Sequence, residues 1–115
     1  MIYVPDHGEE VYDDGHMYGR KHSEVNYHIA RYEMEIPFWI WGSPQFMEKH
    51  PDDWQAIRNA KDRPMMTDAL PHLLLYLGGI STPLYREQLN VISPAYNVNR
   101  PRILRGETDY NTLRK

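Results

Sequence analysis

Short apolar blocks separated by polar stretches make up this 115-residue chain. Residues 2–4 form an apolar run that predicts the end of a buried parallel strand, and residues 5–30 predict a long polar loop. Loops of that length are usually functional or disordered. Residues 31–41 predict a second strand, because alternating polar and apolar positions give way to a fully apolar end. Pro37 would lie at a bulge or sheet edge of this strand, and residues 42–44 would end it.

The second half of the chain predicts two helices and two short strands. The first helix spans about 51–60, with Pro51 at its first position and Asp52 near the positive end of the helix dipole. Short apolar pieces at 89–92 and 103–104 predict edge strands near the end of a sheet.

The other helix has the clearest signals in the chain. Asp68 is the expected N-cap, Pro71 stands at the third helical position, and glycines at 78–79 end the helix. Its leucines recur with the i, i+3, i+4, i+7 spacing of one buried face. These leucines are Leu70, Leu73, Leu74 and Leu77.

Composition excludes several classes of protein. The net charge of −3 and the pI near 6.0 argue against a nucleic-acid partner, which usually requires a basic stripe. The chain has no cysteine, which excludes disulfides, thiolate zinc sites and cysteine nucleophiles. No stretch of the sequence approaches the roughly 20 apolar residues of a membrane span.

Asp6 and His7 are the leading candidates for chemistry. They follow the first predicted strand directly, and carboxylate and imidazole groups are common zinc ligands. Ligand sites of α/β folds lie beyond the C-terminal ends of strands. The alternative is a simple turn, in which Asp6 caps the backbone, Gly8 has a positive φ and His7 has no role.

The long loop also contains His22 and His16. Either imidazole could fold back toward Asp6-His7 and donate a hydrogen bond to a phosphoryl group, or it could be an ordinary exposed histidine. Of the others, His28 has no partner by spacing, and His50 is expected to cap the helix at 51–60. His72 is expected to be a satisfied histidine of the leucine-rich helix.

Four carboxylates follow Gly8: Glu9, Glu10, Asp13 and Asp14. A calcium or magnesium loop is conceivable, but the EF-hand spacing does not occur. A solvated acidic loop is the favoured interpretation. No Gly-x-Ser-x-Gly, phosphate-binding-loop or dinucleotide motif occurs in the sequence.

Four motifs in a fixed order indicate a family. They are Tyr-Val-Pro-Asp-His-Gly-Glu-Glu-Val-Tyr-Asp at 3–13, Gly-Arg-Lys-His-Ser at 19–23, Glu-Ile-Pro-Phe-Trp-Ile-Trp at 35–41 and Asp-Ala-Leu-Pro-His-Leu-Leu at 68–74. Together they resemble the C-terminal part of the bacterial phosphoethanolamine transferases, sulfatase-like members of the alkaline phosphatase superfamily. The resemblance covers nearly the whole chain, residues 1–115.

This resemblance implies a fold and a set of site residues. The chain would be the C-terminal part of an alkaline-phosphatase or sulfatase-like α/β/α sandwich. Asp6 and His7 would be Zn²⁺ ligands, and His22, or alternatively His16, would lie at the phosphate site. The threonine nucleophile, the acidic zinc ligand and the membrane-spanning helices of the family precede the part that this chain resembles.

The resemblance further implies transfer of phosphoethanolamine from phosphatidylethanolamine to lipopolysaccharide, lipid A or a related envelope glycan. The complete enzyme would be anchored in the bacterial inner membrane, with its catalytic domain in the periplasm. The alternatives are a sulfatase or phosphodiesterase of the same superfamily, or an inactive remnant. By itself the chain is expected to be inactive, marginally stable and prone to self-association, with apolar surface exposed around Phe38, Trp39 and Trp41.

Overall fold

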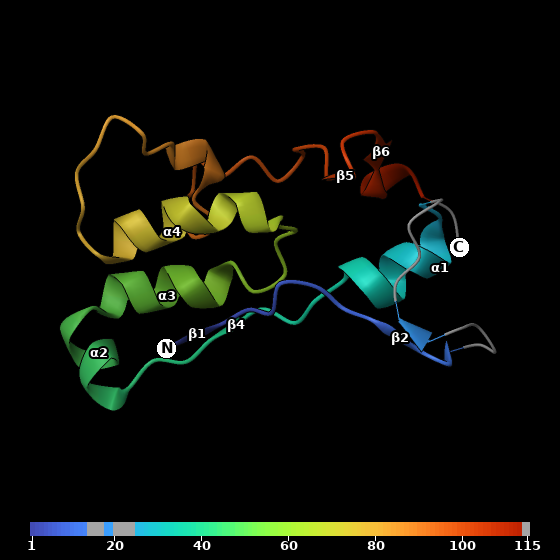
Figure 1. Ribbon diagram of the computed structural model, residues 1–115. Coiled ribbons are helices and arrows are strands. Elements are labelled where there is room, and N and C mark those ends of the chain that lie inside the picture. Colours follow the sequence, from blue (N-terminus) through green and yellow to red (C-terminus); the bar gives the residue numbers. More distant parts are fainter. Residues whose placement is uncertain (14–17, 20–24, 114–115) are drawn as a thin grey trace. The chain divides into compact units, whose positions relative to one another are not determined.

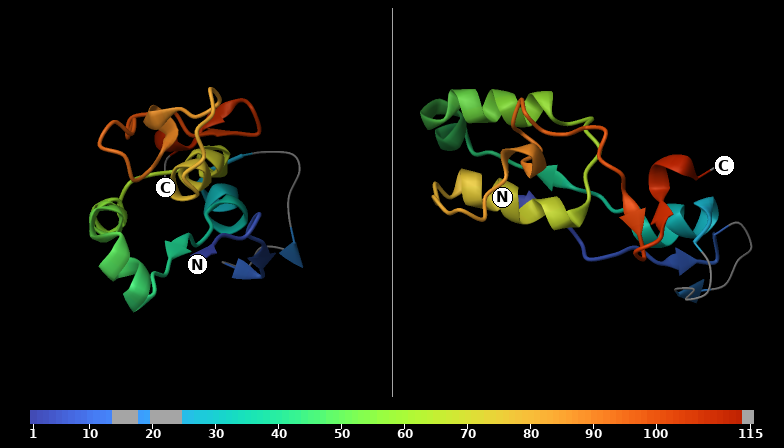
Figure 2. Two further views of the ribbon diagram at one scale, coloured as in Figure 1. Left: turned by 90° about the vertical axis from the view of Figure 1, so that its left-hand side faces the viewer. Right: turned by 90° about the horizontal axis from the view of Figure 1, so that it is seen from above.

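A computed structural model describes residues 1–13, 18–19 and 25–113. The chain forms two compact units, which consist of short strands and helices (Figure 1, Figure 2). Unit 1 contains Met1–Trp41 and Pro101–Lys115, and unit 2 contains Gly42–Arg100.

Unit 1 begins with strand β1 (Ile2–Tyr3), which lies beside strand β4 (Trp39–Ile40) in Figure 1. The two strands are antiparallel, and the Trp41 N–H extends the ladder by donating to the Met1 carbonyl at 2.8 Å. Within the described residues this is the pairing that β1 makes, so the predicted strand exists but its partner runs antiparallel. An apolar run reports burial and carries no information on strand direction.

Unit 1 has two further antiparallel ribbons. Strand β2 (Glu10–Val11) pairs with β3 (Tyr18–Gly19), so a short antiparallel pair interrupts the long loop predicted over 5–30. Strand β5 (Ile103–Leu104) pairs with β6 (Thr108–Asp109), which confirms the predicted strand at 103–104. The 3₁₀ turn η5 (Tyr110–Thr112) follows directly.

Helix α1 (Tyr27–Ile29) continues into a π-helical turn, η2 (Ala30–Met34). The side-chain oxygen of Asn26 accepts a hydrogen bond from the Ile29 N–H at 3.0 Å, which caps the start of α1. The prediction of a strand from residue 31 is therefore wrong for its first half. The alternation there is incidental, because Asn26 starts a helix five residues earlier.

Unit 2 opens with helix α2 (Pro44–Lys49), followed by α3 (Pro51–Asn59). The predicted end of the strand at residues 42–44 is confirmed, and the side-chain oxygen of Ser43 also caps α2 by accepting from the Phe46 N–H at 3.0 Å. Helix α3 is confirmed. His50 stands at its N-cap position as predicted, although its side chain makes no capping hydrogen bond within the described residues.

The third helical region of unit 2 is a 3₁₀ turn, η3 (Thr67–Ala69), that leads into α4 (Leu70–Leu77). The predicted end at residues 78–79 is confirmed, and Gly79 has the positive φ of 66° that favours glycine. Asp68 is not the N-cap. It lies within η3, and its carboxylate accepts two hydrogen bonds from Arg100, one of them 2.8 Å long.

The leucine stripe of α4 is only partly buried. Leu73 is fully buried, whereas Leu74 keeps 49% of its surface exposed in this chain. Helices α3 and α4 lie side by side in Figure 1, and the Tyr76 hydroxyl donates to the Asp53 carboxylate at 2.7 Å between them.

The segment after α4 returns along that helix as the 3₁₀ turn η4 (Glu87–Leu89) and a series of turns (Figure 2). The predicted strand at 89–92 is wrong, although the burial that it implied for Val91 and Ile92 is correct. Arg63 donates to the Val91 carbonyl at 2.9 Å and to the Ser93 carbonyl at 2.6 Å. Side chain–backbone bonds replace a strand ladder there.

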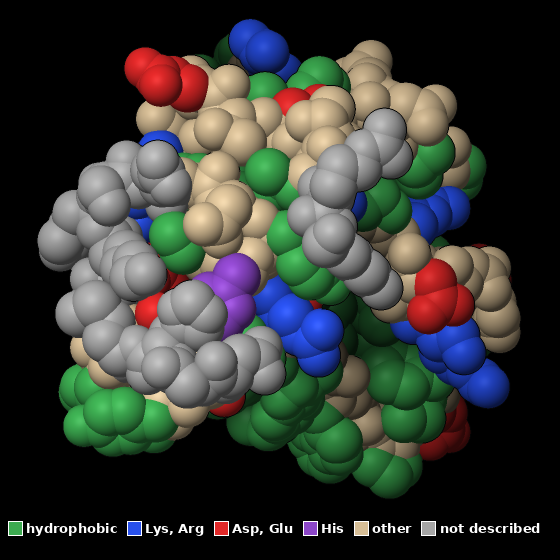
Figure 3. All heavy atoms as spheres, turned by 90° about the vertical axis from the view of Figure 1, so that its right-hand side faces the viewer, with side chains coloured by type: hydrophobic (Ala, Val, Ile, Leu, Met, Phe, Trp, Pro, Cys, Tyr) green, Lys and Arg blue, Asp and Glu red, His purple; other side chains and the backbone are tan. Residues whose placement is uncertain are grey.

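Several large aromatic side chains remain exposed on the β1–β4 ribbon. Tyr3 and Trp39 stack with ring centroids 5.2 Å apart, and Trp41 is 54% exposed. Phe38 is half-buried, so the expected exposure is confirmed for Trp39 and Trp41. Hydrophobic side chains also gather at the lower edge of the face drawn in Figure 3. No helix within the described ranges has the length and hydropathy needed to cross a bilayer.

Candidate functional site

The Asp6-His7 turn lies between β1 and β2 and is ordered by its own hydrogen bonds. The His7 N–H donates to Oδ1 of Asp6 at 3.0 Å. Nδ1 of His7 lies 2.9 Å from the Gly8 carbonyl. A carbonyl oxygen can only accept, so Nδ1 is the donor in this contact. A neutral ring with its proton on Nδ1 is the tautomer that ligates a metal through Nε2.

One side-chain atom of Asp6 and one of His7 face one another across the turn. Nε2 of His7 lies 3.6 Å from Oδ2 of Asp6. At zinc–ligand distances of about 2.1 Å, two tetrahedral ligand atoms lie roughly 3.4 Å apart, so one Zn²⁺ fits between these atoms with little movement. The contact between Nδ1 and the Gly8 carbonyl is of the kind that orients metal-ligating imidazoles in proteins. The donor set therefore fits zinc.

Gly8 anchors the turn to the η2 backbone. Its N–H donates to the Glu33 carbonyl at 2.9 Å. A Cβ atom at Gly8 would lie 2.3 Å from the Tyr32 carbonyl oxygen, closer than any real contact. The residues with positive φ are elsewhere, so this glycine is required by close backbone approach rather than by its φ.

The π turn explains why a carbonyl is available to Gly8. Its closing hydrogen bond runs from the Glu35 N–H to the Ala30 carbonyl at 2.8 Å, an i to i+5 bond. A helix that ends in such a turn leaves its last carbonyls unpaired within the helix, and the Glu33 carbonyl is one of them. Single π turns occur frequently at functional sites.

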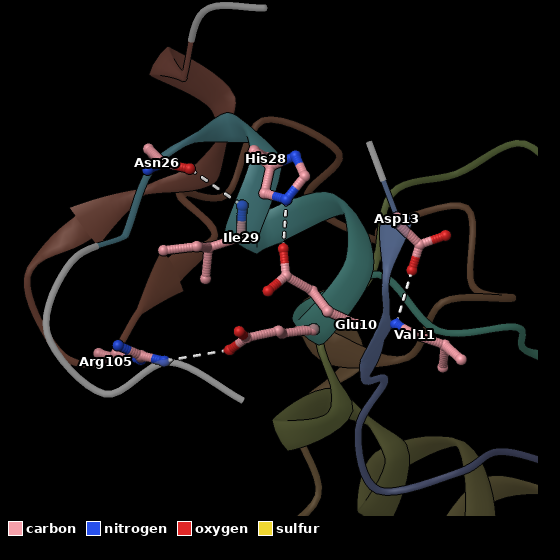
Figure 4. Close-up of polar contacts among 8 residues, drawn as sticks. Glu10, Val11, Asp13, Asn26, His28, Ile29 and Arg105 are labelled. Carbon is pink, nitrogen blue, oxygen red and sulfur yellow. Dashed lines mark hydrogen bonds and ion pairs between the residues drawn. The ribbon is translucent and has the colours of Figure 1, made fainter. Parts of the chain in front are cut away.

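Two buried carboxylates flank this anchor. Glu10 is fully buried, and its Oε1 contacts Nε2 of His28 on α1 (Figure 4). Glu33 is also fully buried and lies 3.4 Å from Nη2 of Arg105. The sequence-based view of Glu10 as part of a solvated acidic loop and of His28 as unpartnered is therefore wrong.

The other described carboxylates of the acidic segment agree better with the predicted solvated acidic loop. Glu9 is exposed, and Asp13 accepts a hydrogen bond from the Val11 N–H at 2.8 Å (Figure 4). Asp14 lies outside the described residues. Burial of Glu10 next to exposed Glu9 follows the alternation of a strand, a signal that was present in the sequence.

The loop histidines His16 and His22 both lie outside the described residues, so their relation to Asp6-His7 stays a prediction. His72 is a satisfied helix-surface residue as predicted, because its Nδ1 accepts from the Arg86 N–H at 3.0 Å. Asp6 is 88% exposed at its side chain and His7 is 34% exposed, so both remain accessible to solvent.

Charge elsewhere in the chain is paired within each unit. In unit 2, the hydrogen bonds from Arg100 lower the pKa of the Asp68 carboxyl. In unit 1, burial and the hydrogen bond to Glu35 raise the pKa of the Tyr110 hydroxyl to about 12. The guanidinium of Arg102 lies 4.5 Å from the Tyr110 ring centre and acts in the opposite direction. These pairs hold structure together away from the Asp6-His7 turn.

Similarity to known proteins extends over almost all of the chain. Phosphoethanolamine transferase EptC of Escherichia coli strain K12 is 30% identical over 118 aligned positions, which include 98% of this chain. Phosphoethanolamine transferase CptA of Salmonella typhimurium strain LT2 is 27% identical over the same share. The resemblance to phosphoethanolamine transferases is confirmed.

The chain spans about one fifth of the length of these curated relatives, since the alignments cover 20% of each. No protein-family model matches the chain, and no solved structure matches it.

Proposed function

We propose that this chain is the C-terminal part of a zinc-dependent phosphoethanolamine transferase, and that Asp6 and His7 are two of its zinc ligands. The observation that carries the proposal is the pair of side-chain atoms of metal-binding type, Oδ2 of Asp6 and Nε2 of His7, which lie 3.6 Å apart in a chain similar to a phosphoethanolamine transferase over 98% of its length. The α/β/α sandwich of the alkaline phosphatase superfamily is the fold proposed for the complete domain.

Each residue of the Asp6-His7-Gly8 turn has a role in the proposed zinc site. Oδ2 of Asp6 and Nε2 of His7 hold the metal, and the Gly8 carbonyl keeps the His7 ring in the ligating tautomer. When bound, zinc supplies a Lewis acid that lowers the pKa of a hydroxyl nucleophile and offsets charge on a phosphoryl group. His22, or alternatively His16, donates a hydrogen bond to the phosphoryl oxygens.

The proposed donor is phosphatidylethanolamine, and the proposed acceptor is lipopolysaccharide, lipid A or a related envelope glycan. A threonine hydroxyl from outside these 115 residues would lose its proton and form a bond to the donor phosphorus. The bond from phosphorus to the diacylglycerol oxygen would break, and that oxygen would take up a proton, so that diacylglycerol leaves as an alcohol. The phosphoenzyme would then pass phosphoethanolamine to the acceptor. Such a protein would be anchored in the bacterial inner membrane, with this part of it in the periplasm.

The test is transfer from a labelled phosphatidylethanolamine donor by the complete product of the gene that encodes this chain. Asp6→Ala and His7→Ala should abolish transfer, while His72→Ala, a histidine in unit 2, should not. His22→Ala should lower turnover roughly 10²-fold or more, the effect of losing one oxyanion-type donor. If His16→Ala has that effect instead, His16 is the phosphate-site residue.

The rival functions give different results in the same assay. Cleavage of the donor without any acceptor product would indicate a phosphodiesterase, and hydrolysis of a sulfate ester would indicate a sulfatase. Wild-type transfer in Asp6→Ala or His7→Ala would contradict the ligand assignment. Absence of all three activities in the complete protein would favour an inactive remnant.

A further inference from the structure

The buried pair of Glu10 and His28 lies outside the proposed zinc site and takes no part in the chemistry described above. Glu10 has no exposed surface, and its Oε1 contacts Nε2 of His28. Burying a carboxylate costs several kcal/mol unless charged or polar groups compensate for the lost water. An apolar residue at this inward-facing strand position would avoid that cost, which suggests a role other than stability.

The location of the pair indicates what that role is. Glu10 follows Gly8 by two residues, and His28 lies on α1, which continues into the η2 turn that holds the Gly8 N–H. The segment that follows the Asp6-His7 turn, which includes β2, is therefore bonded at two points to the helical segment formed by α1 and η2. The two joints are the Gly8–Glu33 backbone bond of 2.9 Å and the Glu10–His28 contact (Figure 4).

The helical side of this connection is itself held in place. His28 packs edge-on against Tyr32, with ring centroids 4.9 Å apart, and Arg105 reaches the Glu33 carboxylate from the β5–β6 hairpin at 3.4 Å. On the other side of the turn, β1 is paired with β4. Asp6 and His7 therefore lie between two anchored segments.

We infer that Glu10 and His28 are positioning residues, which hold the Asp6-His7 turn in the geometry that binds zinc. This inference rests on the proposed function. A side-chain pair that fixes first-shell ligands from outside the shell typically changes metal affinity roughly 10- to 100-fold when it is lost. In this proposal neither residue is a zinc ligand.

The experiment uses the 115-residue chain and two readouts. The first is the hydrogen-exchange rate of the Gly8 amide, which needs no metal. The second is the zinc dissociation constant, measured by competition with a chromophoric chelator. Glu10→Leu and His28→Leu, which keep the buried volume, should speed exchange at Gly8 at least tenfold and weaken zinc binding about 10- to 100-fold.

Matched variants separate positioning from a general structural role. Glu10→Gln keeps an oxygen that accepts from Nε2 of His28, so it should largely restore both readouts. Glu107→Leu removes an exposed glutamate of the same unit and should change neither. The Trp41 amide, bonded to Met1 in the β1–β4 ribbon, should exchange at the wild-type rate in every variant.

Unchanged Gly8 exchange and zinc affinity in both Leu variants would overturn the inference. Equal acceleration at Gly8 and Trp41 would also overturn it, because that result indicates general loss of structure in unit 1. If the wild-type chain binds zinc too weakly to measure, the Gly8 exchange rates still decide whether the pair positions the turn, and the transfer assay on the complete protein decides the proposed function.

Discussion

At the scale of single residues, the Asp6-His7 turn depends on a glycine that has no unusual φ. Gly8 is needed because the Tyr32 carbonyl occupies the space where a Cβ would lie. Because the two backbone segments lie so close together, the Gly8 N–H can donate a hydrogen bond to the Glu33 carbonyl. The Asp-His-Gly motif by itself indicates only a turn. The atom that requires a glycine at position 8 is the Tyr32 carbonyl oxygen, which belongs to a residue 24 positions further along the chain.

Gly8→Ala should therefore destabilise the chain by about 1–3 kcal/mol, because the new methyl group forces two backbone segments apart. Urea unfolding measures this change. Gly78→Ala is the comparison and should cost less, since Gly78 has an ordinary φ of −78° and an added Cβ would lie 3.1 Å from the Leu74 carbonyl oxygen, a contact that a small shift relieves. Equal stability of Gly8→Ala and wild type would contradict the close approach.

Tyr110 provides a prediction about pH. Its raised pKa of about 12, against an ordinary value of 10, means that the folded chain holds the phenolic proton more tightly than the unfolded chain. Its contribution to stability is fully present below pH 10 and is lost as the pH rises toward 12. An absorbance titration that subtracts the Tyr110→Phe trace should show this tyrosine ionising about two pH units late, and a midpoint near 10 would contradict it.

At the scale of elements, the sequence predicted those helix starts and ends that depend on residues within one helical turn. Helix α3 and the end of α4 were predicted because Pro51 and the glycines at 78–79 act within one helical turn. The pair Ser43-Pro44 ends the strand as predicted and also starts helix α2, a second role of the same local signal that the prediction missed.

The residues of the candidate site also differ in whether local sequence could identify them. Asp6 and His7 could be singled out because they are adjacent and follow a strand. The pairing of Glu10 with His28 could not, because the two residues are 18 positions apart and meet only after α1 forms. The Asn26 cap was the missed local signal that would have placed His28 on a helix.

Helix α4 tests the distinction between a periodic pattern and actual burial. Leu73 is fully buried and Leu74 is 49% exposed, although both belong to the predicted stripe. Leu73→Ala should lower the free energy of unfolding by about 2–5 kcal/mol, whereas Leu74→Ala should cost less than about 1 kcal/mol. Urea denaturation of both variants measures the difference, and equal effects would mean that this face of α4 is misassigned.

At the scale of the whole molecule, the chain is much shorter than the relatives that it matches. It matches 20% of the length of each relative and forms two compact units of its own. The stacked Tyr3 and Trp39 rings leave an aromatic surface on the ribbon next to the proposed site. We propose that the rest of a transferase domain covers this surface and completes the zinc ligands.

The most direct test of this account is a zinc titration of the 115-residue chain, followed by long-range ¹H–¹⁵N correlation of the histidine rings. Before zinc is added, the spectrum should show His7 with its proton on Nδ1, as the hydrogen bond to Gly8 requires. Added zinc should then shift Nε2 of His7, and this shift should disappear in Asp6→Ala. The rings of His50 and His72 serve as internal controls and should not respond at the same zinc concentration. A zinc response at those rings with none at His7, or an unchanged His7 response in Asp6→Ala, would contradict the assignment of Asp6 and His7 as a zinc half-site.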